Sequence, residues 1–191
     1  MYMRTDTYEE AISALEMCCE QLLVVPNDTS RWRWIIISLH ISLQGFMVLA
    51  LKGTNGLAIM PAKLEQEWLK AYETNSAFPV EKLDGFMNLY KKVKGNRMLQ
   101  YGGSKQFVPK GKQSSNVKKL NYLRNDFIHF LPKSWSLGVT GLPMICLDCM
   151  HIIKFLYADS GNINWNDENM KNRAGSAINK AIMLLEKIVG G

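Results

Sequence analysis

Leu120-Asn121-Tyr122-Leu123-Arg124-Asn125-Asp126-Phe127-Ile128-His129-Phe130 carries its apolar side chains at the spacing of a helix. Successive residues of a helix rotate by about 100°, so Leu120, Leu123, Phe127 and Leu131 share one face. We expect this face to lie against a hydrophobic core. Arg124 borders the same face, whereas Asn125 and His129 are four residues apart and lie together on the other side.

The other apolar segments have the same period and are bounded by capping residues, proline or glycine. Asp6 or Thr7 can cap the first helix and Asn166 or Asp167 the last, and Pro132 closes the helix quoted above. Helices are predicted over residues 7–25, 30–51, 62–72, 80–93, 114–131, 143–157 and 167–189, with a glycine- and lysine-rich loop at about 95–113. No alternating strand pattern appears, so we predict an all-α fold, a bundle of five to seven helices forming a single domain over residues 1–191.

Positive charge is concentrated in one region of the chain. The net charge is +6, and residues 91–124 hold ten basic residues and no acid, which leaves 13 basic and 17 acidic residues elsewhere. Such a region attracts polyanions. The candidate RNA-binding residues are Lys105, Lys110, Lys112, Lys118 and Lys119, with Tyr101 and Phe107 as candidate stacking residues. The alternative is a solvated lysine-rich loop without a ligand.

Arg124, Asn125 and His129 together suit phosphodiester chemistry. RNA is cleaved without a metal when its 2′-hydroxyl attacks the adjacent phosphate, which leaves a 2′,3′-cyclic phosphate. A histidine can move the proton near neutral pH, an arginine can neutralise the phosphate oxygens, and an amide can orient one of them.

On a straight helix the side chains of Arg124 and His129 diverge by about 140°. They can converge if the helix loosens near Pro132, or if a second subunit supplies its own pair across a two-fold axis. In the alternative, Arg124 pairs with Asp126 or a helix end, and His129 packs on Trp135.

The stretch of residues 120–130 resembles the signature helix of the HEPN superfamily, in which a polar residue follows an arginine and four to six positions separate that arginine from a histidine. The match is at Arg124, Asn125 and His129. The resemblance implies a helical bundle, a homodimer, and a metal-independent endoribonuclease of a toxin–antitoxin or phage-defence system, with RNA and an antitoxin or regulatory protein as partners and with no cofactor. It equally admits a non-catalytic module that binds RNA, nucleotide or a protein.

His40 lies in an apolar segment, four residues before Gln44. It is either a core histidine bonded to a neighbouring carbonyl or, with Gln44, part of the same cleft as Arg124. A buried histidine must find a partner in both cases.

The remaining signals concern metals, redox chemistry and membranes. Cys146-x-x-Cys149 is followed by His151, but no second pair completes a zinc site, so no metal is expected. Polar residues interrupt the apolar segment Trp34 to Leu51, and the amino terminus is acidic, so neither a membrane span nor a secretory signal is expected. We therefore expect a cytoplasmic protein with reduced thiols.

Overall fold

A computed structural model describes residues 2–129, 134 and 136–190 of the chain. Over these residues the protein is all helical and contains no strand, which confirms the predicted all-α bundle of five to seven helices. The seven α-helices are α1 (Thr7–Val24), α2 (Trp32–Leu51), α3 (Ala62–Glu73), α4 (Phe86–Val93), α5 (Gln113–Ile128), α6 (Leu142–Ala158) and α7 (Glu168–Gly190).

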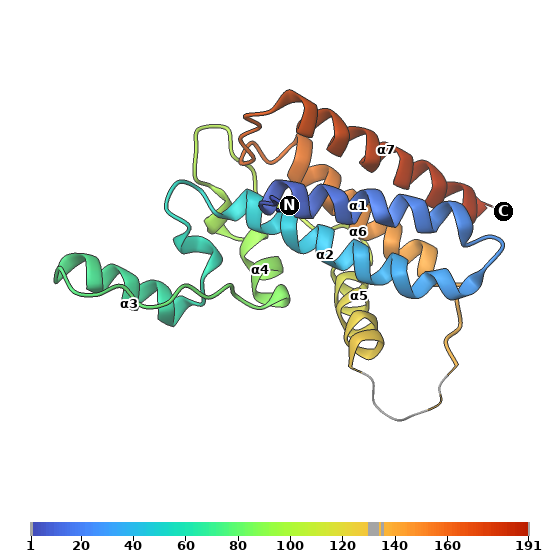
Figure 1. Cartoon of the computed structure of the whole chain (residues 1–191), viewed down its shortest axis with the longest axis horizontal. Helices are drawn as coiled ribbons and strands as arrows, with labels where there is room; N and C mark the ends of the chain where they lie inside the picture. The colour runs from blue at the N-terminus through green and yellow to red at the C-terminus, as the bar shows by residue number, and fades with distance from the viewer. Residues whose placement is uncertain (1, 130–133, 135, 191) are drawn as a thin grey trace.

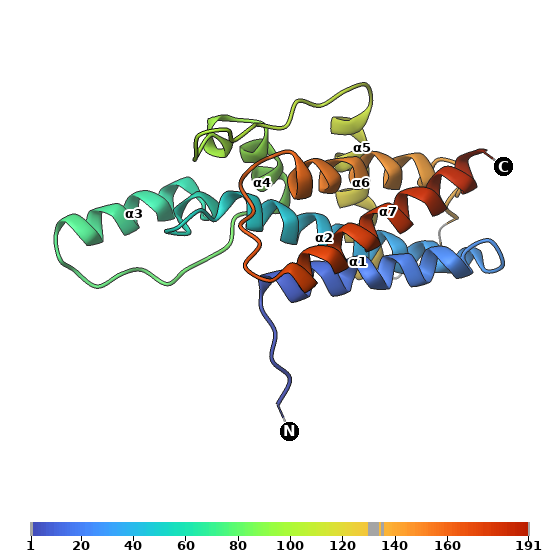
Figure 2. The ribbon, with the colours of Figure 1, turned by 90° about the horizontal axis from the view of Figure 1, so that it is seen from above.

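The core lies among α1, α2, α6 and α7, which run side by side, with α5 packed on α2 and α6 (Figures 1 and 2). The central helix is α2, whose faces meet α1, α4, α5 and α6. The segment Thr29–Leu51 is long and apolar enough to cross a membrane, with a mean hydropathy of 1.9, but 72% of its apolar stretch is buried by the rest of the fold. This burial is what the central helix of a bundle requires.

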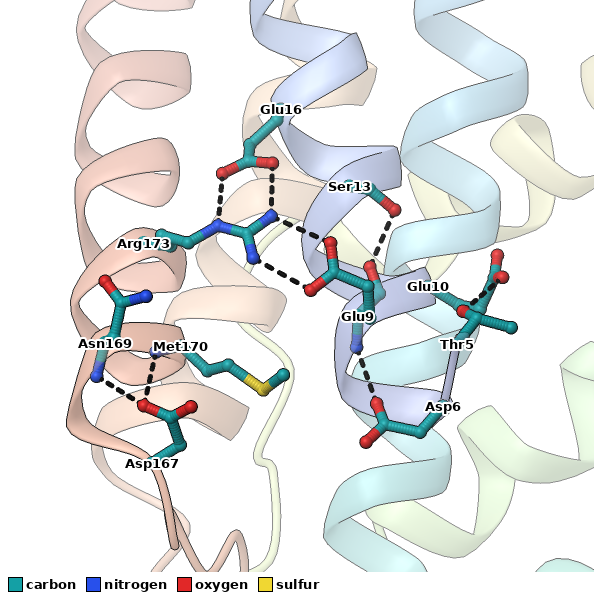
Figure 3. A network of polar contacts seen from close by, with 10 residues as sticks. All are labelled: Thr5, Asp6, Glu9, Glu10, Ser13, Glu16, Asp167, Asn169, Met170 and Arg173. Carbon is teal, nitrogen blue, oxygen red and sulfur yellow. Dashed lines mark hydrogen bonds and ion pairs between the residues drawn. The ribbon is translucent and has the colours of Figure 1, made fainter. Parts of the chain in front are cut away.

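Two contacts fix α1 against its neighbours. Gly45 of α2 lies so close to Ala11 that a Cβ on Gly45 would come within 2.6 Å of the Ala11 Cβ. On the other side, Arg173 of α7 grips Glu9 and Glu16 of α1 with four hydrogen bonds of 2.8–3.0 Å (Figure 3). The bundle is therefore held by close helix approach on one side of α1 and by a charged clamp on the other.

The predicted capping residues act at both ends of the chain. Asp6 accepts a hydrogen bond from the Glu9 amide and starts α1. Asp167 accepts from the Asn169 and Met170 amides and starts α7. These caps are local in sequence, which is why they could be predicted.

The predicted start of the fourth helix at residue 80 is wrong, because α4 begins at Phe86. The Asp84 amide donates to the carbonyl of Ile59, and its carboxylate accepts from the Gly85 amide and the Asn88 side chain. These bonds hold the segment before Phe86 extended and carry it back from α3, which projects from the bundle (Figure 1).

The basic loop is attached to the bundle at several points. The Asn162 side chain donates to the carbonyls of Ala50 and Met98, and the Lys105 amide donates to Ser160. Phe107 is buried beside the rings of Tyr90 and Phe155. Phe107 is thus a core residue, so it does not serve as the stacking residue considered from the sequence, whereas the Tyr101 side chain is half exposed.

Candidate functional site

The helix α5 carries the arginine, the asparagine and two of the candidate lysines. Its buried side chains Val117, Leu120 and Leu123 face α2 and α6, as the period predicts. It ends at Ile128, earlier than predicted, and His129 adopts an extended conformation with φ −87° and ψ 92° while its amide still bonds to Asn125. Leu131 and Pro132, on which the predicted end depended, lie outside the described residues.

The side chains of Arg124 and Asn125 contact each other. Arg124 is half buried, and its Nη1 donates to Oδ1 of Asn125 at 3.1 Å. Within the described part of the chain, Arg124 Nε is covered from solvent and has no hydrogen-bond acceptor. A buried guanidinium nitrogen without an acceptor is unfavourable, and an anion is its best partner.

His129 lies just beyond the end of α5, with an exposed side chain. Since it has left the helix, the angle of about 140° calculated for a straight helix does not describe it. Among the described residues no hydrogen bond joins its ring to Arg124 or Asn125. Trp135, its alternative packing partner, lies outside the described residues.

His40 is buried on α2 and faces the same helix as the motif. Its Nε2 lies 3.0 Å from Oδ1 of Asn121, and its ring stacks on Phe86 with centroids 3.9 Å apart. Burial, helped by the nearby Arg124 charge and opposed by the Asn121 hydrogen bond, lowers the pKa of His40 to about 4. His40 is therefore neutral at pH 7, and its bond to the partly buried Asn121 lies beside Arg124.

Gln44 lies elsewhere. It lines a hollow between α1 and α2 together with Glu10 and Leu83. The structure thus brings His40 close to Arg124 but places Gln44 in different surroundings.

Lys118 and Lys119 border a hollow of about 430 Å³ between α5, α6 and the segment that leads into α6. Its walls are apolar, formed by Leu123, Leu142 and Ile145, and Tyr122 lines it with 64% of its side chain exposed. No carboxylate lines it among the described residues. Lys105, Lys110 and Lys112 are exposed in the loop before α5.

The hollow, Tyr122 and Asn121 were not among the residues singled out from the sequence. Tyr122 follows Lys118 and Lys119 by four and three residues, the spacing of one helix face, and this signal could have identified it. The role of Asn121 could not be predicted from nearby residues, because its hydrogen-bond partner His40 is 81 residues away in the chain.

The cysteines are buried and free. Burial raises the pKa of Cys18 to about 12 and that of Cys19 to about 11, so these thiols stay protonated and unreactive. In the part of the chain that the structure describes, no three His, Cys, Asp or Glu side chains gather where they could hold a metal ion.

Comparison of this chain with protein-family models, with curated proteins and with solved structures finds no match.

Proposed function

We propose that this protein is a HEPN-type RNA-binding protein whose α5 site cleaves single-stranded RNA without a metal. The observation that carries the proposal is the arrangement along α5. Exposed Lys118 and Lys119 beside an apolar hollow precede a partly buried Arg124–Asn125 pair, and an exposed His129 follows the helix end.

Lys118, Lys119 and the hollow beside them account for RNA binding. The two ammonium groups attract phosphates, and the exposed Tyr122 ring offers a surface on which a base can stack. The hollow next to it takes the apolar face of that base. Asp126 is the single acid of α5, so the helix keeps a net positive charge.

Arg124, Asn125 and His129 account for RNA cleavage. The half-buried Arg124 guanidinium binds a phosphate oxygen, and the Asn125 amide orients another. His129 removes the proton of the 2′-hydroxyl, whose oxygen then bonds to phosphorus. The bond from phosphorus to the 5′-oxygen breaks, and that oxygen takes a proton from solvent. The product carries a 2′,3′-cyclic phosphate. On this proposal the protein acts in a toxin–antitoxin or phage-defence system, in the cytoplasm.

The test is cleavage of single-stranded RNA in excess EDTA, with the ends of the products identified. The wild type should yield 2′,3′-cyclic phosphate ends, His129→Ala should lose at least about a hundredfold in rate, and both should melt at the same temperature because His129 is exposed. His151→Ala, a change on α6, is the matched control and should keep the rate. Equal rates for the wild type and His129→Ala would refute the role of His129.

The second candidate is a non-catalytic RNA-binding module, which the partial burial of Arg124 and its bond to Asn125 favour. In that case RNA binds but stays intact, and Arg124→Ala lowers the melting temperature because Asn121, Asn125 and His40 lose a packed neighbour. Binding and cleavage measured on the same labelled RNA separate the two functions.

A further inference from the structure

The exposed cation Arg33 lies near the start of α2, over the ring of Phe127 near the end of α5. Its guanidinium carbon is 5.9 Å from the centre of that ring. Within the described part of the chain Arg33 forms no ion pair, whereas Arg31, two residues before it, is bonded to Asp28 at 2.8 Å. Arg33 is therefore available to an anion from outside the chain, and the sequence alone did not single it out.

Two contacts between α2 and α5 place Arg33 relative to Arg124. His40 of α2 is bonded to Asn121 of α5. Arg33 lies seven residues before His40, and its contact Phe127 lies six residues after the contact of His40. Seven residues are close to two whole turns, so His40 and Arg33 lie on the same face of α2. The two helices therefore run in opposite directions along this face.

Arg124 lies between the two contacts. It is three residues after Asn121 and three residues before Phe127, so its side chain leaves α5 between theirs. The Arg124 charge also reaches His40 and helps to lower its pKa, as expected for a side chain directed towards α2. Arg33 and Arg124 thus supply one guanidinium from each helix to the surface where α2 meets α5, and we call this surface the α2–α5 strip.

We propose that Arg33 is a second phosphate-binding residue of the α5 site, which holds the phosphate next to the one that is cleaved. This role rests on the proposed function, because both phosphates belong to the same RNA strand. It defines the substrate more closely, as a strand that carries a further phosphate beside the scissile linkage.

The contact with Phe127 leaves Arg33 able to bind that phosphate. Attraction to an aromatic ring leaves most of the five N–H donors of a guanidinium without an acceptor. These donors match phosphate oxygens in pairs. Two guanidinium groups on the α2–α5 strip also favour a ligand with more than one negative charge over a single anion. A nucleic-acid strand with successive phosphates has this property.

The first experiment measures how a labelled single-stranded RNA binds at several salt concentrations, by fluorescence anisotropy. Arg33→Gln removes one phosphate contact, so the slope of log affinity against log salt concentration should become shallower by about 0.7. Arg33→Lys keeps the charge and should keep the slope. Arg31→Gln removes a nearby cation that is already paired with Asp28, and this matched control should leave the slope unchanged.

The outcomes of this experiment separate the role of Arg33 from the proposed function. A wild type that binds RNA with a slope that Arg33→Gln does not change would overturn the role of Arg33 and leave the α5 site in place. A wild type that binds no RNA would overturn both. Arg33→Gln should melt with the wild type because the side chain is exposed, so a changed slope reports on the phosphate contact.

The second experiment adds the neighbouring phosphate to a minimal substrate. The substrates are a dinucleotide with a single phosphodiester and the same dinucleotide with an extra phosphate at its 5′ or at its 3′ end. For the wild type, one of the two added phosphates should raise kcat/KM at least about tenfold, and Arg33→Gln should lose that gain. If the wild type binds without cleaving, the affinities of the same compounds replace the rates. A gain that Arg33→Gln retains, or no gain from either phosphate, would overturn the role of Arg33.

Discussion

Oδ1 of Asn121 lies 3.0 Å from Nε2 of His40, a hydrogen bond that joins the central helix α2 to α5 one turn before Arg124. The bond lies beside the stacked pair His40 and Phe86 and within reach of the Arg124 charge. It therefore ties the core of the bundle to α5 one turn before Arg124, the residue that we assign to the phosphate.

The stability of the protein should depend on His40 in mildly acidic solution. Burial lowers the pKa of His40 from 6.5 to about 4, so the unfolded state binds a proton that the folded state rejects. The free energy of unfolding should then fall as the pH falls from about 6.5 towards 4, by up to about 3 kcal/mol, and stop falling on this account below pH 4. Urea unfolding at several pH values measures this change in the free energy of unfolding.

The control for this prediction is His40→Gln, which keeps a donor for Asn121 but does not titrate. Its stability should fall less than that of the wild type over the same interval. Parallel curves for the two proteins would show that His40 is not the group responsible.

The clamp of Arg173 on Glu9 and Glu16 should contribute measurably to stability. Arg173→Ala removes four hydrogen bonds between α1 and α7 and leaves two carboxylates unpaired (Figure 3). Because the groups are about one third exposed, we expect a loss of only about 1–2 kcal/mol. Urea unfolding at neutral pH measures the difference from the wild type.

The same clamp predicts a pH dependence of the same sign as that of His40, at lower pH. The hydrogen bond from Arg173 holds the pKa of Glu9 below its usual value, so the clamp is fully present above pH 4.5 and is lost as the pH falls through the folded pKa. Arg173→Ala should lose less stability than the wild type between neutral pH and pH 3. Lys171→Ala, which removes an exposed pair with Glu168, is the control and should follow the wild type.

The sequence predicted the features that arise from nearby residues. The caps at Asp6 and Asp167 and the apolar faces of α2 and α5 depend on residues within a few positions, so the helical bundle could be predicted. The start of α4 could not, because the Asp84 amide bonds to Ile59, which is 25 residues away in the chain. Helix propensity depends only on nearby residues, so it does not reveal a bonding partner this far along the chain.

Some features of the candidate site likewise depend on nearby residues, and others depend on packing. Arg124, Asn125 and the lysines could be chosen from sequence because charge and spacing are local properties. The hollow beside Lys118 could not, since its walls come from α5, α6 and the segment before α6, which meet only in the folded chain. The separation of Gln44 from His40 is also a property of packing, because Gln44 lies against α1 whereas His40 bonds to Asn121 of α5.

Removing the two lysines of α5 should weaken RNA binding in a salt-dependent manner. Lys118→Ala combined with Lys119→Ala removes two cations from the rim of the hollow. The slope of log affinity against log salt concentration should become shallower by about 1.4 for a single strand. Fluorescence anisotropy with a labelled oligonucleotide at several salt concentrations measures it.

A matched pair of lysines tests whether the position of the charge matters. Lys180→Ala combined with Lys187→Ala removes two exposed cations from α7, on another part of the surface. This control should change the slope by less than the α5 pair. An equal change from both pairs would mean that RNA responds to net charge alone, and the α5 face would lose its assignment.

Tyr122 should contribute to RNA binding through its ring and not through its hydroxyl. With 64% of the side chain exposed above an apolar hollow, the ring is available for a base to stack. Tyr122→Ala should cost about 1–3 kcal/mol of binding free energy, whereas Tyr122→Phe should bind nearly as the wild type does. Tyr72→Ala, which removes a similarly exposed ring from α3, should leave binding unchanged. Because both positions are exposed, the melting temperatures of the three variants should stay close to that of the wild type, so a loss of affinity reports on the contact itself. If Tyr122→Phe loses as much affinity as Tyr122→Ala, the hydroxyl makes the contact, and the base does not stack at this hollow.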